Sequence, residues 1–144
     1  MKVVRLYNIL THPESHLTCI DTFQNSYAYQ YFCQNTNAHK NKITVYKERS
    51  DKALRTLHNE VFDFIYVDGS HFAVDVLTDA ILGFLLLRSG GIMFFDDYPY
   101  KDYFARDSVK TGIDAFLSVF YGRYTIICFY MNEDRTGQIG IRKN

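Results

Sequence analysis

The fold is decided by the stretch FDFIYVDGSH, which runs from Phe62 to His71. Its first six residues are rich in β-branched and aromatic side chains, which favours a strand buried on both faces, with Asp63 as an interruption near the entry. An unpaired carboxylate is too costly for the interior of such a strand, so Asp68 marks the end of the strand. Gly69 then permits a sharp turn. Because open α/β sheets bind ligands beyond the carboxyl ends of their strands, we expect a site here.

A second copy of this design follows. A glycine pair makes a turn, Ile92–Phe95 makes an apolar strand, and Asp96 and Asp97 close it. Neighbouring strands lie roughly 5 Å apart, so the terminal carboxylates converge if the two strands pair. Like charges that close repel unless a proton or a cation lies between them. We therefore predict a metal or ligand site that includes Asp68, the alternative being that each acid caps a helix or binds backbone amides.

Other side chains near predicted strand ends are candidates for binding or catalysis. His71 lies three residues beyond Asp68 and can be a general base, a metal ligand or a nucleotide contact, or can simply cap a helix. Asp21 closes an early strand, where an acid can accept hydrogen bonds from both hydroxyls of a ribose, although alone it is better explained as a turn or capping residue. Ser50 follows the next strand, and in isolation helix capping is its expected role.

Strands and helices alternate along most of the chain. The apolar spacing predicts helices over Val3–Leu10, Ser26–Asn35, Ser50–His58, Phe72–Leu87 and Val109–Phe120, and strands over Leu17–Ile20, Ile43–Tyr46, Phe62–Val67, Ile92–Phe95, Tyr124–Met131 and Gln138–Arg142. Ser50 or Asp51 is expected to cap the third helix, and Gly90 to end the fourth. This order predicts one α/β domain over residues 1–144, with a mostly parallel sheet and a closing antiparallel hairpin at one edge.

The bulk composition narrows the class of protein. The 144 residues are 47% hydrophobic and 22% charged, as in a soluble globular domain. Sixteen basic and sixteen acidic residues give zero net charge, which argues against a general binder of nucleic acid or anionic membranes. The apolar runs are too short to span a bilayer, and we expect no signal peptide. The odd, widely spaced cysteines are those expected of reduced thiols in a cytoplasmic protein.

Four blocks of the sequence together resemble class I S-adenosylmethionine-dependent methyltransferases, most closely the branch related to sugar and catechol-type O-methyltransferases. The blocks read LTCIDTF at 17–23, FDFIYVDGSH at 62–71, LLRSGGIMFFDDY at 86–98 and QIGIRK at 138–143. The resemblance implies a Rossmann-like sheet with helices on both faces, and S-adenosylmethionine as the cofactor. It also implies cofactor contacts from Asp21 to the ribose, from the region of Ser50 to adenine, and from Asp68 and His71.

The resemblance further implies a divalent metal such as Mg²⁺ held by Asp68, Asp96 and Asp97, as in metal-dependent members. One block of the family pattern is not found. Such enzymes begin with a strand and a glycine-rich turn of the type E-x-G-x-x-x-G, whereas this sequence opens in what resembles the following helix. We therefore expect an N-terminally truncated relative. Either the flanking strands pair directly, or a partner chain supplies a strand and the protein is a homo-oligomer.

The leading hypothesis is methyl transfer from S-adenosylmethionine to the hydroxyl of a small molecule, a sugar or a phenol. His71 or an aspartate such as Asp68 would take the proton. One alternative is an inactive methyltransferase-like remnant that serves as a binding or assembly module. Another is a metal-dependent hydrolase, which uses the same acids but leaves Asp21 unexplained. Tyrosines at 98, 100 and 103 suggest an aromatic entrance, which suits sugars and phenols alike.

Overall fold

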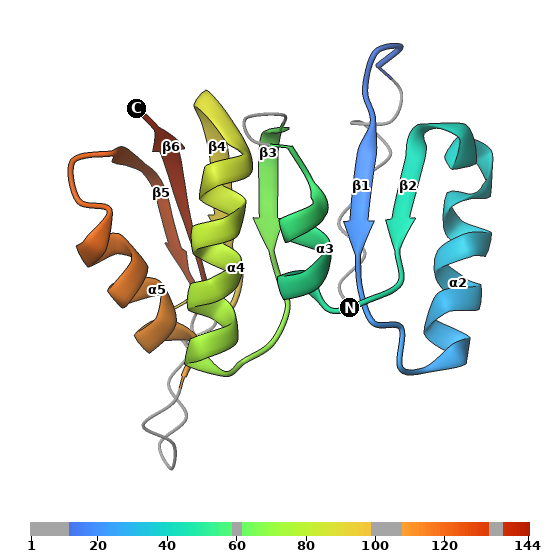
Figure 1. Cartoon of the computed structure of the whole chain (residues 1–144), viewed down its shortest axis with the longest axis horizontal. Coiled ribbons are helices and arrows are strands. Elements are labelled where there is room, and N and C mark those ends of the chain that lie inside the picture. The colour runs from blue at the N-terminus through green and yellow to red at the C-terminus, as the bar shows by residue number, and fades with distance from the viewer. Residues whose placement is uncertain (1–11, 59–61, 99–107, 133–136) are drawn as a thin grey trace. The chain divides into compact units, whose positions relative to one another are not determined.

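The computed structural model of this chain describes residues 12–58, 62–98, 108–132 and 137–144 (Figure 1). The chain divides into two compact units, unit 1 (Met1–Ala53) and unit 2 (Leu54–Asn144). The helix predicted over Val3–Leu10 lies outside the described residues. Within the described ranges, no helix is long and apolar enough to cross a membrane. The mixed α/β class predicted from the sequence is confirmed, with parallel strand pairing in both units.

Unit 1 contains one pair of parallel strands. The strands β1 (Leu17–Ile20) and β2 (Ile43–Tyr46) pair in register and are joined by α2 (Ser26–Thr36) and the 3-10 helix η1 (Asn37–Lys42). The side chain of Asn25 caps α2 by accepting a hydrogen bond from the backbone N–H of Tyr27 at 2.9 Å. Both strands are where the sequence predicts them, and α2 ends one residue later than predicted.

The start of α3 (Ser50–Thr56) differs from the prediction. Ser50 and Asp51 lie inside the first turn of the helix and do not precede it. The carbonyl of Arg49 accepts hydrogen bonds from the backbone N–H groups of Lys52 and Ala53, both at 3.1 Å. Capping by Ser50 or Asp51 is therefore wrong, because the helix begins one residue earlier than a cap at Ser50 requires and two residues earlier than a cap at Asp51 requires.

Unit 2 contains a four-stranded sheet in the order β3-β4-β6-β5. Its elements are β3 (Phe62–Val67), α4 (Ala73–Leu86), β4 (Leu87–Phe95), α5 (Val109–Val119), β5 (Tyr124–Met131) and β6 (Gly137–Lys143). β3 and β4 are parallel, whereas β6 is antiparallel to both β4 and β5. The predicted hairpin at one edge is confirmed, and so is the predicted pairing of residues 64–67 with residues 92–95.

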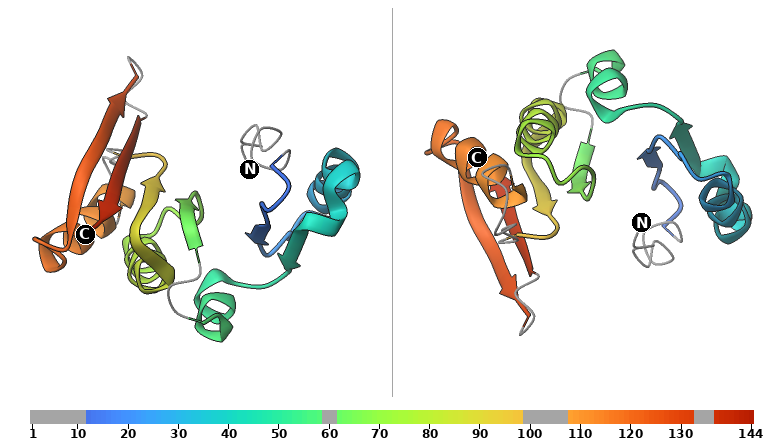
Figure 2. Two further views of the ribbon diagram at one scale, coloured as in Figure 1. Left: turned by 90° about the horizontal axis from the view of Figure 1, so that it is seen from above. Right: turned by 90° about the horizontal axis from the view of Figure 1, so that it is seen from below.

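One face of this sheet packs on two helices. Figure 2 shows α4 and α5 on the same side of the four strands. Met93, Phe95 and Ile141 of the sheet are fully buried with Phe116 of α5 in the core cluster. A Cβ atom on Gly112 of α5 would lie 2.5 Å from the carbonyl oxygen of Ala73, so only glycine allows α5 to approach α4 this closely. The dense core fixes the strand ends that follow Val67 and Phe95.

Two local predictions for unit 2 are wrong. β3 is not buried on both faces, because alternate side chains point to opposite faces: Ile65 packs on the core, whereas Phe64 is 44% exposed. Gly90 does not end α4. The helix ends at Leu86 because Leu87 is already extended and begins β4. Gly90 has a φ of +77° and lies within β4, where the register between β3 and β4 shifts. It therefore allows a β-bulge or similar irregularity in the strand.

Candidate functional site

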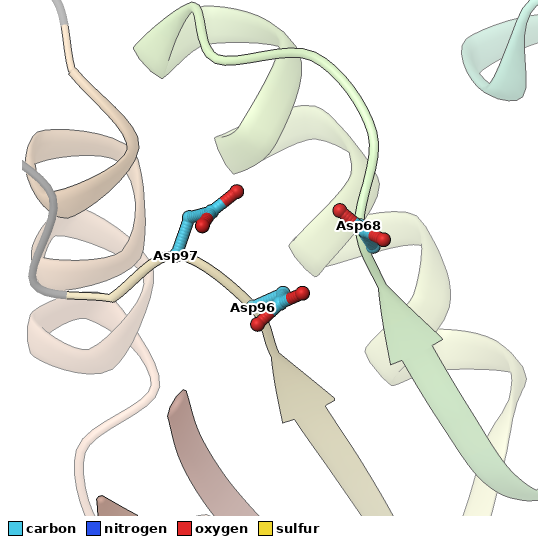
Figure 3. A group of neighbouring side chains, drawn as sticks. All are labelled: Asp68, Asp96 and Asp97. Carbon is cyan, nitrogen blue, oxygen red and sulfur yellow. The ribbon is translucent and has the colours of Figure 1, made fainter. Parts of the chain in front are cut away.

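The acids that follow β3 and β4 lie together at one end of the sheet (Figure 3). The backbone N–H of Asp96 donates to the carbonyl of Val67 at 3.0 Å, so the parallel ladder continues one residue past β4 and brings Asp96 beside Asp68. One carboxylate oxygen from each of Asp68, Asp96 and Asp97 lies within 4.8 Å of the other two. The predicted convergence of these carboxylates is therefore what the structure shows.

Asp97 leaves the strand through an unusual backbone conformation. Its φ of +56° is in the left-handed region, which aspartate tolerates better than most residues because its short polar side chain can bond locally. Oδ2 of Asp97 lies 3.1 Å from Nε2 of His71. His71 comes from the turn between β3 and α4, and its side chain is 58% exposed. The imidazole is thus exposed to solvent and in contact with the acid cluster.

A small pocket opens at this cluster. The acids and His71 line its polar side, and Val76, Val109 and Ile113 from α4 and α5 line its apolar side. The walls therefore combine charged groups with aliphatic surface.

Asp96 is the most deeply placed of these acids, with only 6% of its surface exposed. Gln138 of β6 donates from Nε2 to Oδ1 of Asp96 at 3.0 Å and to the hydroxyl of Tyr66 at 2.7 Å. Burial raises the pKa of Tyr66, and its hydrogen bond to Asp96 and the charges of Asp96, Asp68 and Asp97 raise it further. Tyr66 is therefore a hydrogen-bond donor at ordinary pH and not a base.

Sequence reasoning missed both Tyr66 and Gln138. A signal existed for Tyr66, because it stands two residues before Asp68 in a strand and therefore lies on the same face of the sheet. Gln138 gave no such signal. The contact between Gln138 and Asp96 requires that β6 pair with β4. The predicted hairpin does not by itself say which of its two strands pairs with the rest of the sheet.

The aromatic entrance predicted from the tyrosines is described only at Tyr98. Its hydroxyl donates to Oδ1 of Asp114 at 3.0 Å, and the Nζ of Lys110 lies 5.3 Å from the centre of its ring. Burial, then the hydrogen bond to Asp114, raises the pKa of Tyr98. Tyr100 and Tyr103 lie outside the described residues.

Asp21 and Ser50 belong to unit 1, whereas Asp68, His71 and the other acids belong to unit 2. Oδ1 of Asp21 accepts a hydrogen bond from the backbone N–H of Phe23 at 2.7 Å, which closes a turn in which Phe23 has φ of +45°. The structure thus shows the turn role that we weighed for Asp21 as the alternative to ribose binding. Ribose and adenine contacts by Asp21 and Ser50 stay predictions.

Comparison with known proteins identifies the class of domain. The sequence model of a family described as a methyltransferase domain matches residues 3–98. The chain therefore belongs to this methyltransferase-domain family. The matched segment includes every acid of the strand-end cluster together with His71.

Solved structures with a similar fold include several methyltransferases. The O-methyltransferase TomG from Streptomyces achromogenes, solved with S-adenosylmethionine, has a TM-score of 0.71 at 16% identity over 92% of this chain and 63% of that one. An O-methyltransferase from Bacillus cereus, solved with S-adenosylhomocysteine, has a TM-score of 0.64 at 14% identity over 90% and 74%. The N-methyltransferase NodS from Bradyrhizobium japonicum has a TM-score of 0.59 at 19% identity over 89% and 73%.

The chain spans 60%, 53% and 63% of the length of three of the similar structures, TomG being the last. No curated protein matches the sequence. At these identities the structural likeness establishes the fold, which is the Rossmann-like methyltransferase fold that the motifs predict.

Proposed function

We propose that this chain transfers a methyl group from S-adenosylmethionine to a hydroxyl of a small molecule, with a divalent cation bound by Asp68, Asp96 and Asp97. The observation that carries the proposal is the strand-end acid cluster in a domain of the methyltransferase family. The cofactor assignment is supported by the similar structures solved with S-adenosylmethionine or its demethylated product. The similar structures include both O- and N-methyltransferases, so oxygen as the acceptor atom, like the phenol or sugar class of acceptor, comes from the sequence resemblance.

The residues present fit a hard divalent cation. Carboxylate oxygens are the ligands that Mg²⁺ prefers, and three of them lie within 4.8 Å of one another here. Ionised carboxylates gathered this closely repel, and a cation between them removes that repulsion. A bound cation would supply Lewis-acid chemistry, because a chelated acceptor hydroxyl has a lowered pKa.

His71 is the candidate general base. Because a carboxylate can only accept hydrogen bonds, Nε2 of His71 carries a proton where it faces Asp97, and Nδ1 is then the basic nitrogen. The acceptor hydroxyl would give its proton to Nδ1 while its oxygen forms a bond to the methyl carbon. S-adenosylmethionine would supply that methyl group, with the electron pair of the broken carbon–sulfur bond left on sulfur. Asp68 is the second candidate for the base.

The domain acts mainly by positioning in this proposal. Transfer requires oxygen, methyl carbon and sulfur in line, and holding reactants in such a geometry is itself a large catalytic effect. Asp68 and His71 are proposed to contact the cofactor in unit 2, and Asp21 and Ser50 are the candidates of unit 1 for ribose and adenine. Tyr98, whose ring lies beside Lys110 and Phe129, is a candidate for contact with an aromatic acceptor.

Calorimetric titration of the full chain with S-adenosylmethionine, with and without Mg²⁺, tests this proposal. We expect cofactor binding in both conditions and transfer of a labelled methyl group to catechol or sugar acceptors only with the metal. Transfer that is equal in excess chelator would overturn the metal role and leave the methyltransferase role. Failure to bind the cofactor would overturn methyl transfer and favour the alternative of a binding or assembly module.

A further inference from the structure

We propose that Tyr66 and Gln138 are positioning residues that hold Asp96 so that it offers a cation one carboxylate oxygen, which makes the site prefer Mg²⁺ to Ca²⁺. The inference rests on the cation site of the proposed function. Neither of these two side chains belongs to the acid cluster itself.

Tyr66 and Gln138 lie on strands β3 and β6, and Asp96 is the first residue after β4; the three side chains share one face of the sheet. β4 lies between β3, which carries Tyr66, and β6, which carries Gln138. The side chains next to them in sequence, Val67, Phe95 and Ile139, pack in the core on α4 and α5, so Tyr66, Asp96 and Gln138 point to the opposite face. Strand order and register therefore bring the three side chains together.

Counting donors shows how firmly Asp96 is held. The amide nitrogen of Gln138 has two hydrogens, and the structure directs one to Asp96 and the other to the hydroxyl of Tyr66. An amide nitrogen only donates, so the Tyr66 oxygen accepts there and keeps its own hydrogen for Asp96. A carboxylate that is 6% exposed is thus held through Oδ1 by an amide that is itself bound to a phenol, and among the described residues its buried Oδ2 has no hydrogen-bond partner. Hydrogen bonds to an ionised group are stronger than neutral ones.

This anchoring affects which cation fits. Oδ1 of Asp96 already accepts an amide hydrogen bond, which weakens it as a metal ligand. Oδ2 of Asp97 is engaged in the same way by His71. Each of these carboxylates is left to bind through its other oxygen. Mg²⁺ needs a small octahedral shell and takes one oxygen from each carboxylate, with waters in the remaining positions, whereas Ca²⁺ takes six to eight oxygens and often binds carboxylates through both.

The test is calorimetric titration of the full chain with Mg²⁺ and with Ca²⁺ in the absence of cofactor. Gln138→Met keeps the length of the side chain and removes both N–H donors. We expect it to weaken Mg²⁺ binding about 10- to 100-fold, the loss typical when an outer partner of a metal ligand is removed. Ca²⁺ should lose less, so the ratio of the two affinities falls. A merely structural role would weaken both ions alike.

Tyr66→Phe is the second variant, because it removes one oxygen atom and nothing else. It should shift the affinity ratio in the same direction by a smaller factor, since the Gln138 bond to Asp96 remains. Tyr130→Phe is the matched control. Tyr130 pairs with Gln138 across the β5–β6 ladder, but its side chain is 57% exposed. The same atom is removed from the same sheet there, and both affinities should stay unchanged.

The outcomes separate this inference from the proposed function. Unchanged Mg²⁺ affinity and an unchanged Mg²⁺-to-Ca²⁺ ratio in both variants overturn the inference and leave the cation site standing. No Mg²⁺ binding by the unmodified chain overturns the cation site and the inference together, while cofactor titration of the same sample still reports on methyl transfer. If Gln138→Met does not fold, as judged by circular dichroism, Tyr66→Phe decides alone.

Discussion

Among the described residues, at least one strand of each parallel pair is followed directly by an aspartate, and the aspartates after β1 in unit 1 and β3 in unit 2 act differently. Asp21 follows β1 in unit 1, and Asp68 follows β3 in unit 2. The carboxylate of Asp21 turns back on its own backbone and accepts from the N–H of Phe23. Asp68 instead lies with Asp96 and Asp97, contributed by the neighbouring strand end. An acid at a strand end therefore becomes a candidate site when the adjacent strand also ends in acid.

The physical difference lies in how the charge is compensated. A single carboxylate with a backbone N–H two residues on satisfies one of its oxygens locally, which is a common turn motif. Gathered carboxylates have no such local solution, since each one disfavours ionisation of the next. Unit 2 supplies long-range donors for them, Gln138 to Asp96 and His71 to Asp97. Such donors, brought from elsewhere in the sequence, distinguish a built site from a turn.

The largest effect is expected from His71→Gln. If His71 takes the proton of the acceptor, turnover should fall about 100- to 10,000-fold, the usual contribution of a general base. Mg²⁺ affinity should change little, because the glutamine amide can still donate to Asp97. The measurement is the rate of methyl transfer at saturating cofactor, with His12→Gln, in an exposed turn of unit 1, as the control. Full activity in His71→Gln would move the base to Asp68.

Asp97→Asn should have the next largest effect. It removes one charge from the cluster and should weaken Mg²⁺ binding about 10-fold or more, because a neutral amide oxygen is a weaker ligand for a hard cation than a carboxylate oxygen. Asparagine adopts a positive φ as readily as aspartate, so the fold should survive. Asp114→Asn is the control, because Asp114 of α5 pairs with Lys110 of the same helix, accepts from the hydroxyl of Tyr98 and is not part of the acid cluster. Equal Mg²⁺ titrations of the Asp97 variant and the unmodified chain would remove Asp97 from the site.

The sequence predicts the architecture well because the apolar periods are strong and the acids mark the strand ends. Every strand in the described residues overlaps a predicted one, and the acid cluster follows from the pairing of Ile92–Phe95 with β3. The failures have a common cause. Whether Gly90 ends a helix or interrupts a strand depends on where β4 begins to pair, which is a tertiary property. The burial of Phe64 likewise depends on which face the helices cover.

The residues of the candidate site that directly follow a predicted strand could be predicted from the sequence. Asp68, Asp96, Asp97 and His71 stand next to strand ends that the sequence shows directly. Gln138 reaches Asp96 across 42 residues of sequence, and only the order β4-β6-β5 brings the two together. Long-range donors to predicted site residues are therefore the part of this site that needs a structure.

Substitutions of Asp21 are expected to have a smaller effect, limited to the stability of the turn after β1. Asp21→Ala removes the bond to Phe23 and leaves a backbone with φ of +45° unsupported, which should cost about 0.5–1.5 kcal/mol of unfolding free energy. Asp21→Asn keeps an acceptor oxygen and should cost less. Urea unfolding followed by circular dichroism measures both. Because Asp21→Asn preserves the turn, any loss of cofactor affinity in that variant reports on ribose binding. Neither variant should alter Mg²⁺ binding, and a change there would contradict the separation of the two strand ends.

The smallest effect is expected at Asp63, an acid of the same strand that leads to Asp68. Its partner is Arg88, whose Nε lies 2.5 Å from Oδ1 of Asp63. The side chain of Arg88 is 60% exposed and that of Asp63 is 76% exposed. Exposed ion pairs contribute about 0.2–1 kcal/mol, and salt screens them further. Asp63→Asn should therefore lower the unfolding free energy by less than about 1 kcal/mol at low salt and by almost nothing at 1 M salt. A larger loss that persists in high salt would contradict the description of Asp63 and Arg88 as an exposed, screened ion pair.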